Sequence, residues 1–301
     1  MCPFLPCKQV KHMKKAYILA AISIFFWSTV ATVTKLLMGS LSSMQVLWVS
    51  SFFAGGFWLV FNIATGNIKK LKAYSAKDWL KTVLIGLPGT FLYYLLFYTG
   101  TDLMLASQAF IINYLWPIMS VVFACIILKE KLTVRKCIAI GMSFLGVTIV
   151  AGSDLASMNG QALLGALCCA VAAASYGLFT ALNTKSGYDK RLSMMVFYFV
   201  TFILTGTILA VQGKIPQLNW LQTAGMAYNG IFTMAIASTG WAIALESGKT
   251  AKISNLAYIT PFLSLVWTAV FLHEEIQWTS LLGLIVIVAG IFIPLKDKEK
   301  M

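Results

Sequence analysis

Two similar proline-containing segments carry the residue types best suited to binding a small molecule in this chain. Residues 113–117 (Asn, Tyr, Leu, Trp, Pro) and residues 258–261 (Tyr, Ile, Thr, Pro) each lie inside a long apolar run. Proline has no backbone N–H, so neither Pro117 nor Pro261 can donate to the carbonyl four residues earlier. We therefore expect free carbonyl oxygens beside polar-tipped aromatic rings, which together could hold an ammonium group and an aromatic side chain.

Polar-tipped side chains in the middle of apolar runs form the candidate binding site. Tyr, Trp and Asn side chains need hydrogen-bond partners or a cavity when they lie deep in a membrane. The alternative interpretation is that the prolines only kink helices and the aromatic rings only pack, and the sequence leaves it open. The candidate substrate-binding residues are Trp27, Tyr94, Asn113, Tyr114, Trp116, Pro117, Tyr176, Trp241, Tyr258 and Pro261.

The composition indicates that these segments cross a membrane. The 301 residues are 59% hydrophobic and 11% charged, whereas soluble domains carry about 25% charged residues. This excludes a soluble globule, a disordered chain, a collagen and a disulfide scaffold. We expect an all-α membrane protein.

Ten apolar runs approach the length of about 20 residues that a transmembrane helix needs. The first follows Lys14 and Lys15, but it exceeds a signal-peptide core and lacks a clear cleavage site, so we count it as a span. Whether Met1 or Met13 is the native start stays open. The predicted spans are residues 17–38, 41–63, 80–99, 103–128, 136–151, 163–182, 193–211, 221–245, 252–272 and 278–295.

The positive charges predict the orientation. With these spans, all of the 23 Lys and Arg residues except Lys35 and Lys214 fall on one side. Cytoplasmic loops are enriched in Lys and Arg, so we expect both termini in the cytoplasm. Lys35, near the outer end of its span, is expected to extend to the surface.

The chain also shows an internal repeat. A shift of 144 positions aligns Tyr114 with Tyr258, Pro117 with Pro261, and Asp102 with Glu246. The predicted halves are residues 1–155 and 156–301, with five helices each. Five is odd, so the second half must enter the membrane inverted. Inverted repeats are typical of secondary transporters, which hold their substrate where the repeats meet.

Two acidic residues are candidates for gating or coupling. Asp102 and Glu246 are repeat mates at opposite ends of the predicted spans. They could act in a gate or carry a coupled proton, and the alternative is that they are ordinary charges at the membrane surface.

The placement of charge limits the cargo. No Lys, Arg, Asp or Glu lies near the centre of a predicted span. Burial of a lone charge is costly, so we expect a neutral or zwitterionic small molecule. The aromatic residues favour an aromatic side chain, or a flat cation held through cation–π contacts.

Other functions lack their motifs. The two histidines, His12 and His273, and the six cysteines have no zinc-ligand spacing, so we expect no metal and no cofactor. We find no intramembrane nucleophile paired with a base, so we expect no catalytic residues and no enzyme. The basic residues form no stripe, which argues against nucleic acid. A channel or a scaffold stays open as an alternative, and the lipid bilayer is the expected environment.

Small residues recur along one predicted helix. Gly165, Cys169, Ala173 and Gly177 are spaced by four and let helices approach closely. They predict packing either inside one chain or between two copies in a homodimer.

The motifs resemble those of a known group of transporters. Residues 26–29 (Phe, Trp, Ser, Thr), 113–117 and 258–264 are similar to the bacterial aromatic amino-acid exporter branch of the drug/metabolite transporter superfamily, of the EamA type. The resemblance covers nearly the whole chain after Met13. It implies ten spans, a central cavity, and export of aromatic amino acids or of toxic flat cations. The motif-matched positions are Trp27, Asn113, Tyr114, Trp116, Pro117, Tyr258 and Pro261; the driving force stays open.

Overall fold

The described part of the computed structural model is built from helices. It comprises residues 7–129, 131, 133–156, 160–245, 256, 257 and 259–292, and within these ranges there is no strand. The expectation of an all-α fold is therefore confirmed for the described residues. Glu246 and Tyr258 lie outside them.

Six segments of the described part of the chain are long and apolar enough to cross a membrane. They are residues 15–38 of α1 (Cys7–Met38), α2 (Ser43–Ala64), Ala76–Leu103, Ala106–Ile127, α8 (Gly160–Ser186) and α9 (Lys190–Val211). The third consists of α3 (Ala76–Gly86), η2 (Leu87–Leu92) and α4 (Tyr93–Leu103), and the fourth of α5 (Ala106–Asn113) and α6 (Trp116–Ile127).

The remaining predicted segments are helical where they are described. They form α7 (Val134–Ala156), the series α10 (Trp220–Tyr228), η3 (Asn229–Ala237) and α11 (Ser238–Leu245), then α13 (Ile259–Leu272) and α14 (Trp278–Phe292). The short η1 (Asn67–Ala73) precedes α3. A total of ten membrane crossings stays a prediction.

Local capping sets several helix starts. The Ser42 hydroxyl accepts from the backbone N–H of Gln45, and the Gln45 side chain accepts from the N–H of Ser42. This pair starts α2 at Ser43, two residues after the predicted start of the span. The same reciprocal pair forms between Asn219 and Gln222 before α10. These pairs satisfy N–H groups that the first turn of a helix leaves unbonded.

One predicted boundary is wrong. We expected a span to begin at residue 103, but α4 continues to Leu103 and the backbone becomes extended at Met104, with φ −142° and ψ −176°. The next helix, α5, begins at Ala106. Residues 103–106 are all apolar, so hydropathy does not show that the backbone turns at Met104.

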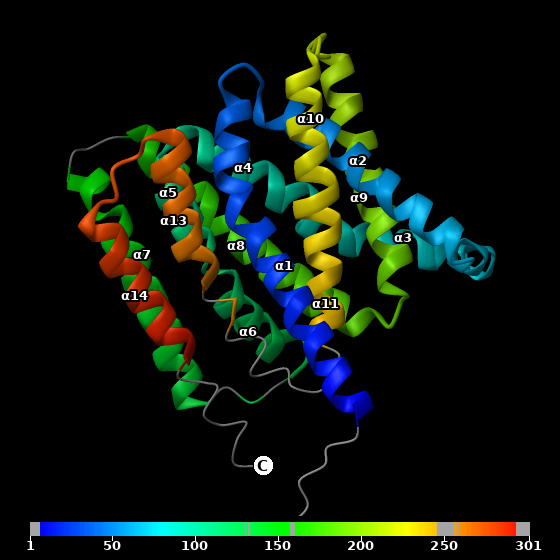
Figure 1. Cartoon of the computed structure of the whole chain (residues 1–301), viewed down its shortest axis with the longest axis horizontal. Helices are drawn as coiled ribbons and strands as arrows, with labels where there is room; N and C mark the ends of the chain where they lie inside the picture. The colour runs from blue at the N-terminus through cyan, green and yellow to red at the C-terminus, as the bar shows by residue number, and fades with distance from the viewer. Residues whose placement is uncertain are drawn as a thin grey trace, which may run out of the picture.

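The helices pair across the two halves of the chain. Figure 1 shows α7 and α14 side by side at one edge, while α1 lies against α11 and α13, and α2 lies against α9. The start of α1 and the end of α14 lie toward the same, lower side of the view. We call this side the Lys190 end, because α9 begins there, and the opposite side the Glu274 end.

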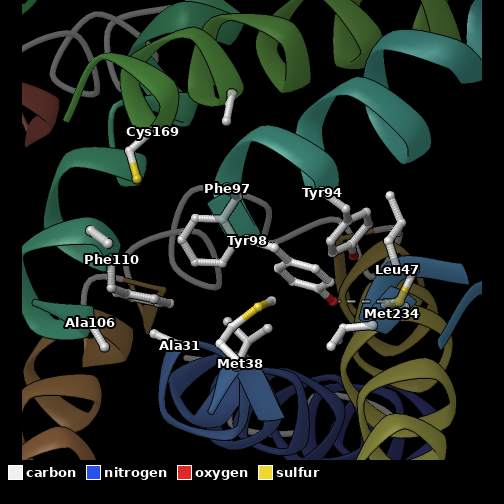
Figure 2. Close-up of a cluster of buried hydrophobic side chains, with 14 of the residues drawn as sticks. Ala31, Met38, Leu47, Tyr94, Phe97, Tyr98, Ala106, Phe110, Cys169 and Met234 are labelled. Atoms are coloured by element: carbon white, nitrogen blue, oxygen red, sulfur yellow. Dashed lines mark hydrogen bonds between the residues drawn. The ribbon is translucent and has the colours of Figure 1, made fainter. Parts of the chain in front are cut away.

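A buried cluster joins these helices. Tyr94, Phe97 and Tyr98 of α4 meet side chains from α1, α2, α5, α8 and η3, and the Tyr98 hydroxyl lies 4.0 Å from the sulfur of Met234 (Figure 2).

The small-residue stripe of α8 packs inside this chain. A Cβ on Gly100 of α4 would collide with the Cys169 sulfur, and one on Gly177 would lie 2.6 Å from the Met119 backbone of α6. The stripe therefore lets α4 and α6 approach α8 closely, as the first of the two packing alternatives predicts.

Candidate functional site

A narrow chamber lies between the broken helices. Its volume is about 50 Å³, and it adjoins a wider chamber of about 490 Å³ that extends to the Lys190 end. Residues that line both chambers are Trp27, Tyr114, Trp116, Tyr176, Ser238 and Ala257. The narrow chamber therefore adjoins the inner part of the wide one, and we refer to the two together as the cavity.

Aromatic residues make up seven of the 13 residues that line the narrow chamber. Trp116 and Tyr176 lie edge to face with ring centroids 5.4 Å apart, and Tyr176 lies 4.7 Å from Tyr93. Across the cavity, Trp27 lies 5.5 Å from Trp241. Such walls offer flat faces to a ring and negative faces to a cation.

The structure brings most of the sequence candidates together. Tyr94, Asn113, Pro117 and Trp241 line one chamber or the other, and Trp27, Tyr114, Trp116 and Tyr176 line both. Pro261 is buried in α13 but is not a lining residue, whereas its neighbour Thr260 is. Tyr258 falls outside the described part of the chain.

An interruption of the helix positions these side chains. The helix stops at Asn113, and α6 restarts at Trp116 with Pro117 in its first turn. Proline is tolerated in a first turn because the N–H there has no helical partner. Asn113 and Trp116 are three residues apart and would share a face of a continuous helix, but Tyr114 would not; with the break, all three line one chamber.

One expectation about the freed carbonyls is wrong. The carbonyl of Ala257, four residues before Pro261, accepts a hydrogen bond from the Tyr114 hydroxyl. This oxygen is therefore used to join the two broken segments and is not free for an ammonium group.

The sequence analysis missed several polar lining groups. Tyr93 accepts a hydrogen bond of 3.1 Å from the Asn113 side-chain amide, and Thr233, Ser238 and Thr260 also line the narrow chamber. Small hydroxyl side chains are common in membrane helices, so they give little signal. Two π-helical segments also contribute: η2 directly precedes Tyr93, and η3 contains Thr233. The apolar pattern of the sequence does not reveal π-helical turns.

Two buried polar atoms in the chamber wall have no partner. Asn113 Oδ1 and Thr260 Oγ1 make no hydrogen bond to any other described residue, although their side chains are 4% and 2% exposed. Buried polar groups are normally paired, so unpaired ones beside a cavity indicate where a ligand or water binds.

The charges around the cavity are unevenly placed. Within the described ranges, no Asp, Glu, Lys or Arg lines the narrow chamber, whereas Lys190 and Arg191 line the wide one. Lys190 donates to the Asn183 carbonyl. The Arg191 guanidinium lies 5.5 Å from the centre of the Phe61 ring and has no acidic partner among the residues described.

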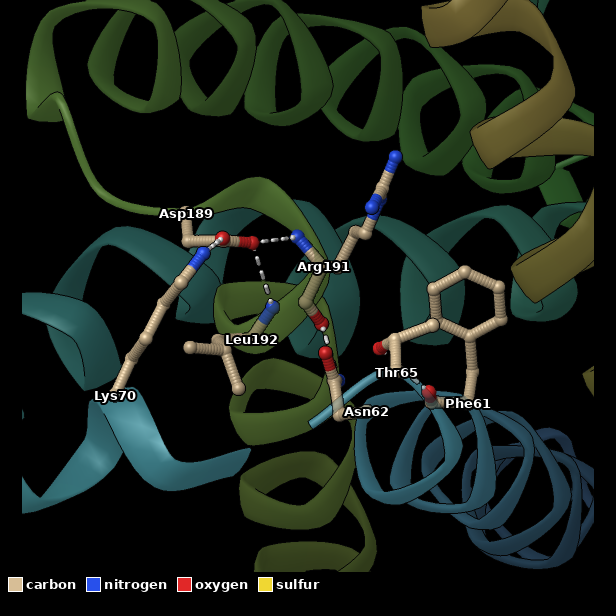
Figure 3. Close-up of polar contacts among 7 residues, drawn as sticks. All are labelled: Phe61, Asn62, Thr65, Lys70, Asp189, Arg191 and Leu192. Atoms are coloured by element: carbon tan, nitrogen blue, oxygen red, sulfur yellow. Dashed lines mark hydrogen bonds and ion pairs between the residues drawn. The ribbon is translucent and has the colours of Figure 1, made fainter. Parts of the chain in front are cut away.

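Asp189 does not neutralise this arginine. Its carboxylate pairs with Lys70 at 2.7 Å and accepts from the backbone N–H groups of Arg191 and Leu192, as Figure 3 shows. Burial alone would raise the pKa of Asp189, but these hydrogen bonds outweigh it and lower the pKa below its ordinary value.

The opposite end of the bundle is held shut by polar contacts. Glu274, in the loop between α13 and α14, accepts from the N–H of Ala106 at 2.7 Å and from the N–H and hydroxyl of Ser107 at 3.0 and 2.6 Å. Gln108 donates to Gln277 at 2.9 Å. These bonds join the start of α5 to the other half of the chain.

Lys35 does not simply extend to the surface, contrary to our expectation. Its ammonium donates to the carbonyls of Thr101, Asp102 and Met104, at 2.7 to 2.9 Å. These carbonyls end α4, where a cation is favoured by the helix dipole. The Asp102 side chain is exposed at this end, away from the aromatic chambers, and Glu246 lies outside the described residues.

The comparisons with known proteins give the family. The sequence pattern of the EamA-like transporter family matches residues 14–152 and again residues 161–295. The chain belongs to the EamA-like transporter family. It is thus a membrane transporter, which agrees with the cavity and with the apolar spans.

Relatives of this EamA-like protein are transporters without an assigned cargo. An uncharacterized transporter of Archaeoglobus fulgidus is 24% identical over 288 residues, which cover 94% of this chain and all of the relative. The uncharacterized transporter YvbV of Bacillus subtilis is 24% identical over 94% of this chain and 92% of its own length. A crystal structure with 18% identity superposes with a TM-score of 0.66 over 95% of this chain and 98% of its own, which shows the shared fold.

Proposed function

We propose that this EamA-like protein is a secondary transporter that exports aromatic amino acids, or similar small neutral or zwitterionic metabolites, from the bacterial cytoplasm. The observation that carries the proposal is the cavity itself. It combines aromatic walls with an inner chamber that no charged side chain of the described residues lines, and with a pair of basic side chains at its wide end. A zwitterion with a flat side chain matches all three features.

The closed end supports alternating access. The cavity reaches the Lys190 end, while Glu274 fastens the start of α5 at the other end. The same eight-residue helix carries Phe110 and Asn113 into the narrow chamber. A ligand that moves the chamber end of α5 would therefore act on the Glu274 bonds at its other end.

The proposed arrangement in the membrane follows from the charges and the repeat. The Lys190 end carries the Lys-rich loops and would face the cytoplasm, so the cavity would take up its cargo there. The two consecutive family matches, residues 14–152 and 161–295, support two related halves. Ten spans in inverted repeats remain part of this proposal.

Efflux of flat cations is the second candidate. The aromatic walls favour it, because cations bind to ring faces. The unpaired Arg191 opposes it, since no acidic side chain of the described residues lines either chamber. We therefore rank the amino acid first.

Counterflow tests the proposal. Purified protein in proteoliposomes preloaded with unlabelled tryptophan is expected to take up labelled tryptophan saturably. If the protein takes up none of tryptophan, phenylalanine and tyrosine but does take up a flat cation such as ethidium, the export of amino acids is wrong and the efflux of cations takes its place.

A further inference from the structure

The narrow chamber holds two hydrogen-bonding atoms that the protein itself leaves unused. Asn113 lies at the end of α5 and Thr260 near the start of α13, and both line the same space of about 50 Å³. Neither Asn113 Oδ1 nor Thr260 Oγ1 has a partner among the described residues. The chamber is too small for an aromatic ring with its own substituents, but it is large enough for a small polar group.

The orientation of Asn113 is fixed by its neighbour. Its amide nitrogen donates to the Tyr93 hydroxyl at 3.1 Å, and Tyr93 in turn packs on Tyr176. This bond leaves the amide oxygen as the unsatisfied atom, and an amide oxygen can only accept. A ligand group that binds here must therefore donate a hydrogen bond.

The surroundings favour a positively charged donor. The rings of Tyr93, Tyr94 and Tyr176 line the chamber, and no described basic side chain does. An ammonium group has three N–H donors and no acceptor, and aromatic faces attract it. A carboxylate offers only acceptors and would meet the amide oxygen with repulsion.

The wide chamber, by contrast, favours a negatively charged ligand group. Arg191 lines the wide chamber, and its guanidinium has no acidic partner within the described ranges because Asp189 is bound to Lys70. A carboxylate is the group that a guanidinium binds most readily. In an α-amino acid one carbon carries both charges, so with the amine in the narrow chamber the carboxylate would face the wide chamber, on the side that Arg191 lines.

We propose that Asn113 Oδ1 and Thr260 Oγ1 are the acceptors for the amino group of the transported compound, which enters the narrow chamber with its amine first and its carboxylate toward Arg191. This inference rests on the proposed function and deepens it. It replaces the proline-freed carbonyl of Ala257, which Tyr114 occupies, as the source of amine recognition.

Three related compounds separate the two charges. Tryptophan has both, tryptamine lacks the carboxylate, and indole-3-propionate lacks the amine. Each is titrated against the purified full-length protein in detergent, and its half-saturating concentration is taken from the rise in melting temperature. The variants are Thr260→Val, which removes the hydroxyl at nearly constant volume, Asn113→Leu, and Arg191→Gln.

Ser264→Ala is the matched control. Ser264 lies one turn after Thr260 on α13, is also buried without a hydrogen-bond partner among the described residues, and lines neither chamber. It therefore reports the general effect of removing an unpaired hydroxyl from this helix.

The expected pattern is selective. Thr260→Val and Asn113→Leu should each raise the half-saturating concentrations of tryptophan and tryptamine about tenfold, as expected for a lost hydrogen bond to a charged group, and change that of indole-3-propionate by less than about twofold. Arg191→Gln should weaken tryptophan and leave tryptamine unchanged. Ser264→Ala should change none of the three.

Other outcomes would overturn the inference. It fails if Thr260→Val and Asn113→Leu weaken indole-3-propionate as much as tryptamine, if they affect neither, or if none of the compounds stabilises the wild-type protein. If the selective pattern appears but tryptophan shows no counterflow, the amine site stands and the proposed export of amino acids is wrong.

Discussion

The hydroxyl of Tyr114 donates to the carbonyl of Ala257 and so joins the two interrupted segments of the chain. Tyr114 follows the last residue of α5, and Ala257 lies two residues before α13. This oxygen, which Pro261 leaves without its helical donor, accepts from the Tyr114 hydroxyl and from the Thr260 N–H at 2.9 Å. The bond also links two segments of the cavity wall, because Tyr114 and Ala257 both line the two chambers.

Removal of this hydroxyl should destabilise the protein. Tyr114→Phe removes one of the two donors to the buried Ala257 carbonyl, which keeps the Thr260 N–H, and is expected to cost about 0.5–1.5 kcal/mol. Thermal unfolding in detergent should show a lower melting temperature. Tyr176→Phe serves as the control, because no described residue forms a hydrogen bond with the Tyr176 hydroxyl. It should change stability by less than about 0.5 kcal/mol. Equal melting temperatures for Tyr114→Phe and wild type would argue against this role.

The Glu274 bonds should control access at their end of the bundle. Glu274→Gln keeps the shape but removes the charge that strengthens the bonds to Ala106 and Ser107. We expect a cysteine introduced at the buried Gln108 to react several-fold faster with a water-soluble thiol reagent in this variant.

Glu275→Gln provides the control for that experiment. Glu275 is the exposed neighbour of Glu274, so its substitution should leave the reaction rate unchanged. If both substitutions raise the rate equally, the effect is one of net charge and not of the bonds to α5.

The pair of Asp189 and Lys70 should make a small, pH-dependent contribution to stability. The folded-state pKa of Asp189 is lowered, so its stabilisation is present above the ordinary value of 3.8 and is lost as the pH falls through the lower folded value. Lys70 is well exposed, so we expect about 0–1 kcal/mol. Asp189→Asn keeps a good N-cap for α9 and isolates the charge.

Melting curves recorded between about pH 3 and pH 7, a range that includes the ordinary pKa of a carboxyl group, measure this contribution. Wild type should exceed Asp189→Asn at the upper limit, and the difference should shrink toward the lower one. A difference that grows on acidification would show that the charge of Asp189 destabilises the fold.

The local sequence predicted much of the site because its signals are short-range. A proline marks the break after Asn113, and polar-tipped aromatics in an apolar run mark the cavity. These rules placed Trp27, Tyr114, Trp116 and Tyr176, all of which line both chambers. They failed for Pro261, because a proline shapes the backbone and its neighbour Thr260 reaches the chamber instead.

Long-range partners could not be predicted. Glu274 bonds to residues 167 and 168 positions away, and Lys35 bonds to carbonyls of α4 that carry no side-chain signal. Tyr93 was missed although its neighbour Tyr94 was a candidate; Tyr94 lies in the buried cluster of Figure 2, and both residues line the narrow chamber. The corner at Met104 is likewise set by tertiary contacts and not by hydropathy.

The ring of Trp116 tests the central claim most directly. It lines both chambers and contacts Tyr176, whereas Trp220 at the start of α10 is 79% exposed and lies outside them. Counterflow of labelled tryptophan should be measured for wild type, Trp116→Ala and Trp220→Ala in proteoliposomes, with melting temperatures confirming that each is folded. Loss of about 1–3 kcal/mol of ring stacking predicts at least about a fivefold fall in uptake for Trp116→Ala and no change for Trp220→Ala. Equal uptake by folded Trp116→Ala and wild type would show that the cavity is not the path of the substrate.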